Sequence, residues 1–483
     1  MKNSFSGTFS VKSSFYDYSF ELPNSSIVEI NLASSAAMKA RDQVAQLTFD
    51  QRKEILQRAV ANYHIDNDEL DHLVKMTGMP KKYVRKRIEF GKKVLSSLPN
   101  IVAMRYGHKF GTITREVFRN GSSILRTTGY ESHRPIDGLV AAFIPPNDPA
   151  EVSFLLGHIV MYGGTAIVKP SISEPYFSIK IAQLLTQAGY PKGALSVVHW
   201  DTRDESRNAV RSELIRRSSH RIIMGGKKTA DLLLKEIDDQ GRCVEEHYST
   251  GKNCIFSSGH SKAIVTEGCD VEQVADLLVK GAYEWTLDCI TTKTVFVVGD
   301  QKAELINSIK KRLDEKLMHL GDPLTEDCEI GYIENAERIV RTIQGVVDFK
   351  SATLHYGKLE SVNKRCIPFL METNQLHSTL LQQELPYTLT IVPVSHVDEA
   401  IAAVNQTSQM LDDGMTMAVS LFSPHPTLES FYASSPDTAR KLLGMRCHLL
   451  MYNKPSTMLN MYLRHQDTML TEFLTQPLSI NHD

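Results

Sequence analysis

The stretch GLVAAFIPPNDPAEVSFLLGHIVMYGGTAIVKP, residues 138–170, decides the fold class of this chain. Residues 138–144 are apolar and strand-like, residues 151–161 have the pattern of a helix, and residues 165–169 are strand-like again. A strand, a helix and a second strand in this order are typical of a parallel α/β sheet. Because ligands of such sheets bind beyond the carboxyl ends of the strands, Asn147, which follows the first strand, is a candidate site residue.

The alternation of strand and helix continues beyond this stretch, with Gly or Pro at most of the joints. Helix-like segments cover 176–188 and 206–217, strand-like segments cover 194–198 and 220–224, and another helix opens near Lys227. Repeated units of this kind predict an α/β protein with a doubly wound parallel sheet, the Rossmann-like arrangement.

Two further regions flank this unit. Before it, residues 1–35 predict one or two edge strands, and a long helical region is broken at Thr77-Gly-Met-Pro80, where Gly78 is the expected C-cap. After it, the pattern predicts a second α/β unit that starts near Asn253. The expected elements of that unit are helices near 271–285, 303–317, 335–345 and 397–405, strands near 293–298, 388–394 and 415–422, and an exposed strand within 472–480.

Composition and charge restrict the class of protein. The chain has 483 residues, 42% hydrophobic and 23% charged, with a net charge of -2, so we expect a soluble protein of two or three domains that does not bind nucleic acid through bulk charge. No apolar run approaches the roughly 18 residues of a membrane-spanning helix, and the N-terminus lacks the apolar core of a signal peptide. Seven cysteines without paired or zinc-ligand spacing predict a reduced, cytoplasmic protein with no metal site.

Cys289 is the strongest candidate nucleophile. It lies in Glu284-Trp-Thr-Leu-Asp-Cys-Ile-Thr-Thr-Lys293, between a helix-like and a strand-like segment. A thiol in this position can attack a carbonyl group, and the side-chain amide of Asn147 can stabilise the oxyanion that forms. The alternative is a small buried apolar side chain, which is the role that we expect for Cys254.

Five segments resemble, in the same order, motifs of the aldehyde dehydrogenase superfamily. They are Thr77-Gly-Met-Pro80 (Thr-Gly-Lys-Pro in the family), Ile144-Pro-Pro-Asn-Asp-Pro149 (Pro-Trp-Asn-x-Pro), Gly163-Gly-Thr-Ala-Ile-Val-Lys-Pro170 (Gly-Asn-x-Val-x-Lys-Pro), Ala188-Gly-Tyr-Pro-Lys-Gly-Ala-Leu-Ser-Val-Val198 (Ala-Gly-x-Pro-x-Gly-x-x-Asn-Val-Val) and the region after Glu384 (Glu-x-Phe-Gly-Pro). The resemblance implies a Rossmann-like nucleotide domain, an α/β catalytic domain and a small β oligomerisation element. The implied boundaries are 1–118 and 137–242 for the nucleotide domain, 119–136 for the β element, 243–453 for the catalytic domain with Cys289, and 454–483 for a C-terminal return whose strand pairs with that element.

The resemblance also implies roles for single residues. Asn147 would be the oxyanion-hole amide that assists Cys289. Lys169 would bind the adenosine ribose and Glu384 the nicotinamide ribose, with Pro145 beside the cofactor.

A cofactor phosphate has a candidate site in Met224-Gly-Gly-Lys-Lys-Thr229. There Gly225 and Gly226 would offer backbone N–H groups at the start of a helix, and Lys227 or Lys228 would add positive charge. The alternative is an ordinary Gly-rich turn with solvated lysines.

Two departures from the family pattern bear on the reaction and the cofactor. Where the family carries its general base in Glu-Leu-Gly-Gly-Lys, we align Tyr248-Ser-Thr-Gly-Lys252, so that Tyr248 replaces the Glu and hydrolysis of an acyl-enzyme should be slow. Glu245 or Glu246 could take over the role of the base. Ile172 stands where members that prefer NAD have a Glu, which favours NADPH and leaves NADH possible.

Within the superfamily, the segments 194–200, 224–227 and 251–256 are most similar to the fatty acyl reductases of bacterial bioluminescence. This resemblance implies that NAD(P)H reduces an acyl-CoA, or an acyl group on a carrier or synthetase, to a long-chain aldehyde through an acyl-Cys289. It also implies an acyl-protein synthetase as partner and a homo-oligomer, dimer or tetramer. The alternatives are oxidation of an aldehyde to a carboxylic acid or acyl-CoA with NAD(P)⁺, and a scaffold without activity.

Overall fold

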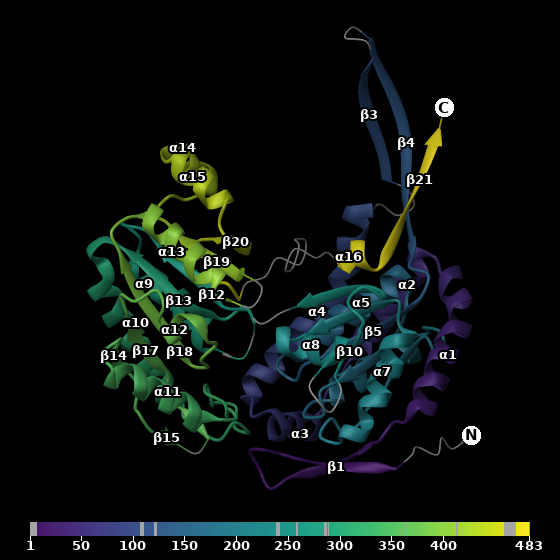
Figure 1. Ribbon diagram of the computed structural model, residues 1–483, viewed down its shortest axis with the longest axis horizontal. Coiled ribbons are helices and arrows are strands. Elements are labelled where there is room, and N and C mark those ends of the chain that lie inside the picture. The colour runs from purple at the N-terminus through teal and green to yellow at the C-terminus, as the bar shows by residue number, and fades with distance from the viewer. Residues whose placement is uncertain are drawn as a thin grey trace.

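The computed structural model describes residues 7–106, 111–119, 123–237, 242–256, 259–284, 287, 289–362, 364–411, 414–457 and 470–482. Figure 1 shows two lobes side by side, with a long hairpin that projects from the lobe drawn on the right. Among the described residues, no helix combines the length and the apolar character that crossing a bilayer requires.

The N-terminal region builds one side of the right-hand lobe. It consists of β1 (Thr8–Lys12) paired with β2 (Ser19–Pro23), followed by α1 (Ile27–Gln46), α2 (Phe49–Ala61), α3 (Asn67–Thr77) and α4 (Lys81–Tyr106). The predicted break is confirmed, because α3 ends at Gly78 with a left-handed φ of 71°. Helix α1 begins earlier than the Ser-rich composition predicts, since Ser26 and Glu29 form a capping box at its start.

The first α/β unit is the predicted parallel sheet. Its strand order is β11-β8-β5-β6-β7, formed by β5 (Leu139–Ile144), β6 (Thr165–Pro170), β7 (Leu195–Val197), β8 (His220–Met224) and β11 (Lys252–Phe256). Apolar cores lie on both faces, the first under α1, α7 (Asn208–Arg217) and α8 (Lys227–Leu234), and the second under α2 to α4, α5 (Pro149–Tyr162) and α6 (Tyr176–Gln187). A hairpin of β9 (Lys235–Ile237) and β10 (Cys243–Glu246) lies between α8 and β11.

The second unit is a seven-stranded sheet with the order β14-β17-β18-β13-β12-β19-β20. Its strands are β12 (Ser261–Val265), β13 (Thr292–Val298), β14 (Thr353–Tyr356), β17 (Phe369–Glu372), β18 (Thr388–Val394), β19 (Thr416–Phe422) and β20 (Cys447–Tyr452). One face packs against α9 (Val271–Tyr283), α10 (Lys302–Leu317) and α11 (Ala336–Asp348), and the other against α13 (Val397–Gln409), α14 (Leu428–Ser434) and α15 (Pro436–Leu443). Short elements complete it: α12 (Thr379–Gln382), β15 (Ser361–Val362) and β16 (Arg365–Cys366).

One boundary expected from the sequence is wrong. The second unit starts at β12 and not near Asn253, because β11 pairs in parallel with β8 of the first sheet. An apolar strand carries no local signal of which sheet it joins, so the pattern alone could not assign it.

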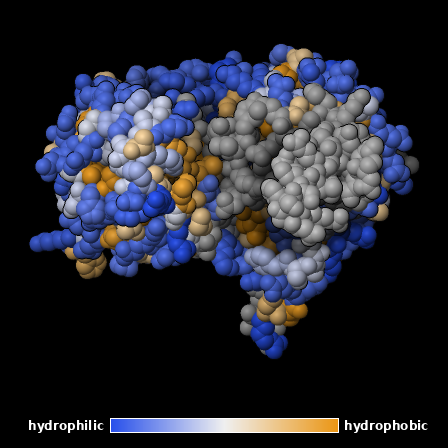
Figure 2. Space-filling model, turned by 90° about the horizontal axis from the view of Figure 1, so that it is seen from above, coloured by the Kyte–Doolittle hydropathy of each residue, from blue (hydrophilic) through white to orange (hydrophobic). Residues whose placement is uncertain are grey.

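The projecting element is a three-stranded antiparallel sheet. Strand β4 (Ser123–Pro135) pairs on one side with β3 (Gly111–Arg119) and on the other with β21 (Thr475–His482), which follows α16 (Leu470–Phe473). The β element therefore starts at Gly111, before the expected residue 119. Seen from above, most of the visible surface is hydrophilic, and apolar residues gather on the side of the left lobe that faces the other lobe (Figure 2).

Candidate active site

Asn147 and Cys289 lie at opposite kinds of strand end in the two large sheets. Asn147 follows the carboxyl end of β5, and Cys289 precedes the amino end of β13. The Asn147 Nδ2 donates a hydrogen bond to the backbone oxygen of Leu287, 3.2 Å away, so the amide lies against the cysteine-bearing loop. The structure thus brings together the two residues that the sequence singled out as the catalytic pair.

Asp148 and Arg87 hold the turn that carries Asn147. Asp148 is 8% exposed and caps α5 by accepting from the backbone N–H of Ala150 at 2.8 Å. Arg87 of α4 binds the same carboxylate with two nitrogens, the Nε at 2.8 Å from Oδ1 and an Nη2 on Oδ2. This two-point ionic contact fixes the helix start, and with it the direction of the neighbouring amide. Neither Asp148 nor Arg87 stands out in the sequence, because their contact joins segments far apart in the chain.

Gly259 lies directly against the Cys289 backbone. A Cβ at this position would lie 1.7 Å from the carbonyl oxygen of Cys289 and 2.8 Å from the Cβ of Met417. Only a residue without a side chain fits there. On the other side of the loop, the Ser456 hydroxyl donates to the carbonyl oxygen of Ile290 at 2.5 Å and bonds Thr292 Oγ1 at 2.8 Å. Cys289 therefore lies on a tightly packed turn.

The alignment of Tyr248 with the family's general base is wrong. Lys252 lies opposite His220, so Tyr248-Ser-Thr-Gly-Lys252 lies at the amino edge of the first sheet, whereas Asn147 lies at the carboxyl edge. The Tyr248 hydroxyl donates to Asp231 of α8 at 2.8 Å. The buried guanidinium of Arg221 anchors the same turn through the carbonyl oxygen of His247, at 2.7 Å, and Thr250 Oγ1, at 3.1 Å.

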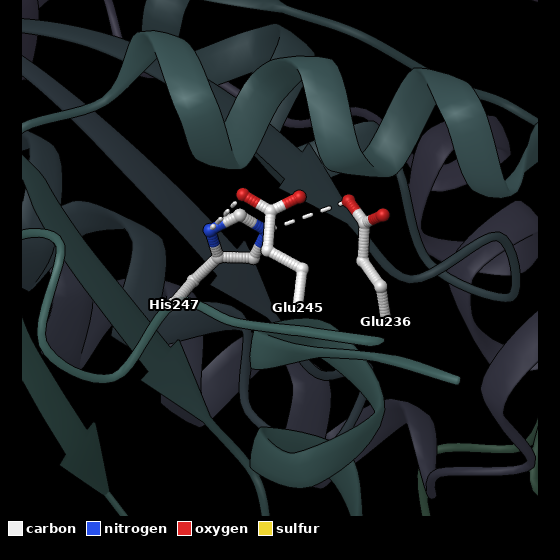
Figure 3. A group of neighbouring side chains, drawn as sticks. All are labelled: Glu236, Glu245 and His247. Atoms are coloured by element: carbon white, nitrogen blue, oxygen red, sulfur yellow. Dashed lines mark hydrogen bonds and ion pairs between the residues drawn. The ribbon is translucent and has the colours of Figure 1, made fainter. Parts of the chain in front are cut away.

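Glu245 is also engaged at that edge (Figure 3). It lies 3.7 Å from Nδ1 of the buried His247, whose Nε2 is 3.4 Å from Glu236. The amino edge and the carboxyl edge of the first sheet are separated by the five residues of β8, which span about 13 Å at a rise of about 3.3 Å per residue. One side-chain atom each from Glu236, Glu245 and His247 lies within 4.8 Å of the other two, as the ligands of a metal ion would. However, Arg216 lies 4.0 Å from both carboxylates and supplies positive charge there. Glu246 is exposed and pairs with Lys235 in the β9–β10 hairpin.

The last residue of β11 begins the stretch Phe256-Ser-Ser-Gly-His260, whose Gly259 contacts the backbone of Cys289. Written against Glu-Leu-Gly-Gly-Lys, it shares the second glycine, at Gly259, and has His260 in the place of the Lys. Phe256, 7% exposed in the apolar core, then stands in the place of the Glu. In this alignment too, the place of the base holds no carboxylate, and the residue there is Phe256 instead of Tyr248.

A cavity of about 390 Å³ lies beyond the carboxyl ends of β5, β6 and β8. The predicted cofactor residues Pro145, Lys169 and Gly225 line it, together with Trp200 and apolar residues of α8. The backbone N–H of Gly225 donates to the carbonyl oxygen of Phe256 at 2.8 Å, which joins the ends of β8 and β11. This is the position at which a doubly wound sheet binds a nucleotide.

The remaining predicted cofactor residues are not among the described lining of this cavity. Gly226 is the N-cap of α8, with no side-chain cap of its own. The Lys227 ammonium lies 2.6 Å from Asp231, one turn along the helix, so its charge is compensated within α8. Glu384 is exposed on the segment between α12 and β18, at the amino edge of the second sheet where Cys289 also lies.

Lys169 is a buried cation in the cavity wall. Its side chain is 6% exposed, and its Nζ donates to the carbonyl oxygen of Pro170 at 2.9 Å and lies 5.1 Å from the centre of the Trp200 ring. Burial lowers the pKa of Lys169 to about 8, against a smaller opposing effect of Asp201. At neutral pH it is therefore still mostly a cation, available to hold an anionic or hydroxyl-bearing ligand.

Two further cations line the cavity that the sequence did not single out. Arg207 directly precedes α7, and Arg211 lies in the first turn of that helix. Among the described residues that line the cavity, Asp204 is the acidic one. Arg207 Nε lies 3.5 Å from Asp204 and is paired with it. Arg211 is half-buried, and this burial lowers its pKa. Ile172, in the place of the Glu of NAD-preferring members, packs instead against the apolar cluster of β1 and β2. The cavity thus has an excess of positive charge.

Sequence comparisons relate this chain to known proteins. The sequence model of the aldehyde dehydrogenase family matches residues 11–416. The chain is 25% identical over 288 residues to the 3-sulfolactaldehyde dehydrogenase of Priestia aryabhattai, which is 58% of this chain and 56% of that protein. It is 24% identical over 280 residues to the malonate-semialdehyde dehydrogenase of Halalkalibacterium halodurans, 56% of this chain and 54% of that protein. The matches therefore span only about half the length of these relatives.

Solved structures support the fold over nearly the whole chain. The NADP-dependent glyceraldehyde-3-phosphate dehydrogenase of Bacillus halodurans C-125, complexed with NADP, superposes with a TM-score of 0.77 at 18% identity and covers 99% of this chain and 96% of its own. The NAD-dependent aldehyde dehydrogenase of Sinorhizobium meliloti gives a TM-score of 0.78 at 18% identity, with 99% and 91% covered. With the family model matched over most of its length, the chain belongs to the aldehyde dehydrogenase family.

Proposed function

We propose that this chain is an NADP-dependent aldehyde dehydrogenase of the acylating type. It oxidises an aldehyde to a thioester on Cys289 and passes the acyl group to a thiol such as that of CoA. The proposal rests on Phe256, the last residue of β11 before Gly259, which we align with the carboxylate of the family's hydrolytic members. Without a base to activate water, the acyl-enzyme persists until a stronger nucleophile arrives.

Each residue of the site has a separate role in the proposed reaction. The Cys289 sulfur adds to the aldehyde carbonyl, and Asn147 donates a hydrogen bond to the oxygen as it becomes negative. Gly259 and Ser456 keep the cysteine turn in one geometry, so the oxygen forms at a fixed place. A bound nicotinamide cofactor supplies the hydride acceptor in this reaction. The incoming thiol then displaces Cys289 from the acyl carbon.

The same steps in reverse reduce an acyl thioester to an aldehyde, the direction that the sequence led us to expect. Nothing in the site chooses between the directions, because both need the same thiolate, the same oxyanion donor and no base. The link to bioluminescence, the long acyl chain and the synthetase partner remain predictions. So does the homo-oligomer, for which the β3–β4–β21 sheet offers a projecting element.

A second candidate is oxidation of an aldehyde to a free carboxylic acid. The names of the relatives, dehydrogenases of 3-sulfolactaldehyde and of malonate semialdehyde, fit this reaction as well as the acylating one, since both oxidise an aldehyde. It requires a water-activating group, and the segment from Phe256 to His260 contains no acidic residue.

The charge of the cavity supports NADPH over NADH. Lys169, Arg207 and Arg211 outnumber Asp204 in the described lining, and Ile172 removes the carboxylate that would repel a 2′-phosphate. A 2′-phosphate carries negative charge that two guanidinium groups can bind with directed hydrogen bonds.

The proposal is tested by following the absorbance of reduced nucleotide. Purified protein is given a short or a long aldehyde with NADP⁺, with and without CoA, and the products are separated by chromatography. Turnover that requires CoA and yields acyl-CoA is expected. Formation of the carboxylic acid without thiol at the same rate would establish the second candidate. The absence of turnover with every substrate would favour a scaffold without activity.

A further inference from the structure

The start of helix α4 is attached to both large units of the molecule. The helix packs on the core of the first unit, and the segments that it meets at its start follow α10 of the second unit. The backbone N–H of Tyr332 donates to the carbonyl oxygen of Gly78 at 2.8 Å, and that of Lys81 donates to the carbonyl oxygen of Pro323 at 2.8 Å. A Cβ at Gly78 would lie 2.7 Å from the carbonyl oxygen of Tyr332, so the two segments touch directly.

Charged side chains of the next turn continue this attachment. The Lys82 ammonium lies 2.6 Å from Glu329, and the Arg85 guanidinium lies 2.7 Å from Glu326. Both carboxylates belong to the connection between α10 and α11 of the second unit. The first two turns of α4 therefore hold a fixed position against the second unit.

Lys86 reaches the segment that leads to the nucleophile. Its ammonium donates a hydrogen bond to Glu284, which directly follows α9 as its C-cap, and Cys289 comes five positions later. Lys82 acts on the same carboxylate more weakly, because the pKa of Lys82 is raised first by its hydrogen bond to Glu329 and only to a smaller extent by Glu284. Lys86 thus supplies the direct ionic contact at the end of α9.

Arg87, the next residue of the helix, holds the other reacting group. It binds Asp148 through two nitrogens, and Asp148 adjoins Asn147. Successive helix residues project about 100° apart while their Cα atoms stay about 3.8 Å apart, so Lys86 and Arg87 can reach different segments from one rigid turn. This turn of α4 connects the oxyanion amide to the entry of the cysteine loop.

We propose that Lys86 is a positioning residue that acts through Glu284 and holds the cysteine loop at the distance from Asn147 at which the oxyanion hydrogen bond forms. This role rests on the proposed function, because the bond is made only during the reaction. The side chains of the pair are 52% and 32% exposed, so the pair contributes little to stability. Its effect is on geometry, since a displacement of about 1 Å can slow a reaction by about 100-fold. Glu284 also lies at the C-terminal end of α9, where the helix dipole disfavours a carboxylate, and Lys86 offsets this.

The test measures kcat and KM separately for variants of this pair. Lys86→Met and Glu284→Gln should each lower kcat about tenfold, while the KM for NADP⁺ changes by less than about twofold. The double variant should be no slower than either single variant, because the same contact is lost in all three. Exchange of the charges, Lys86→Glu with Glu284→Lys, should restore most of kcat, which the loss of side-chain packing alone would not allow.

Lys93→Met is the matched control, because Lys93 is an exposed lysine of α4 about two turns further along. It should leave kcat unchanged. A Lys86→Met protein with the kcat of this control would overturn the proposal, as would losses that multiply in the double variant. If one single variant fails to fold, the other single variant and the charge exchange still decide.

A wild type without any turnover would refute the proposed function and leave the positioning role to a second measurement. Hydrogen–deuterium exchange of the peptide 281–293 should then be faster in Lys86→Met than in Lys93→Met. Equal exchange rates in the two variants would refute the role of Lys86.

Discussion

Replacement of Arg211 by Met should separate the binding of NADPH from that of NADH. Arg211 is half-buried in the wall of the nucleotide cavity, so its charge is only partly screened by solvent. A hydrogen bond between a guanidinium and a phosphate contributes about 1.5–3 kcal/mol. At about 1.4 kcal/mol for each factor of ten, the loss corresponds to a Kd for NADPH that rises about 10- to 150-fold. NADH lacks the 2′-phosphate, so its Kd should change little.

Fluorescence titration of both reduced nucleotides provides the measurement. Arg216→Met serves as the control, because Arg216 lies on the same helix but faces Glu236 and Glu245 outside the cavity. If the Kd for NADPH changes by less than about threefold, or if NADH binding weakens to the same extent, the assignment of this wall to the 2′-phosphate is refuted.

Three further changes test other parts of the site. Asn147→Ala should lower kcat by about 10² to 10³, the usual effect of losing an oxyanion donor, while alkylation of Cys289 and nucleotide binding persist; an unchanged kcat would remove Asn147 from the reaction. Gly259→Ala should abolish turnover or lower the thermal midpoint strongly, because its Cβ would lie 1.7 Å from the Cys289 carbonyl oxygen, and an active, equally stable variant would show that the turn is not packed as described. Phe256→Glu should create CoA-independent acid formation by placing a carboxylate near the acyl-enzyme, measured as product in the absence of thiol; no gain in a folded variant would count against the position assigned to residue 256.

The parts of the fold that the sequence predicts are those with local causes. The strand at 139–144, the helix after it and the break at Gly78 follow from apolar period, capping residues and glycine conformation, and all are present in the structure. Asn147 and Cys289 were found because each follows or precedes a clear strand, and parallel sheets place such residues at strand ends.

The parts that were missed depend on contacts between distant segments. Tyr248-Ser-Thr-Gly-Lys252 and Phe256-Ser-Ser-Gly-His260 both end in a glycine followed by a basic residue, and only the pairing of β11 with β8 shows which of them reaches Cys289. In the sequence, Arg207 and Arg211 have the pattern of solvated helix residues. Only the packing of β5, β6 and β8 shows that they line the cavity.

The most direct test of the thiol-dependent reaction is the lifetime of the acyl group on Cys289. The protein is mixed with aldehyde and NADP⁺ without thiol, quenched in acid and digested, and the mass of the peptide 281–293 is measured over time. We predict an acyl adduct on Cys289 that accumulates to nearly one per chain and disappears when CoA is added. Release of carboxylic acid without thiol, with no adduct on Cys289 at any time, would contradict it.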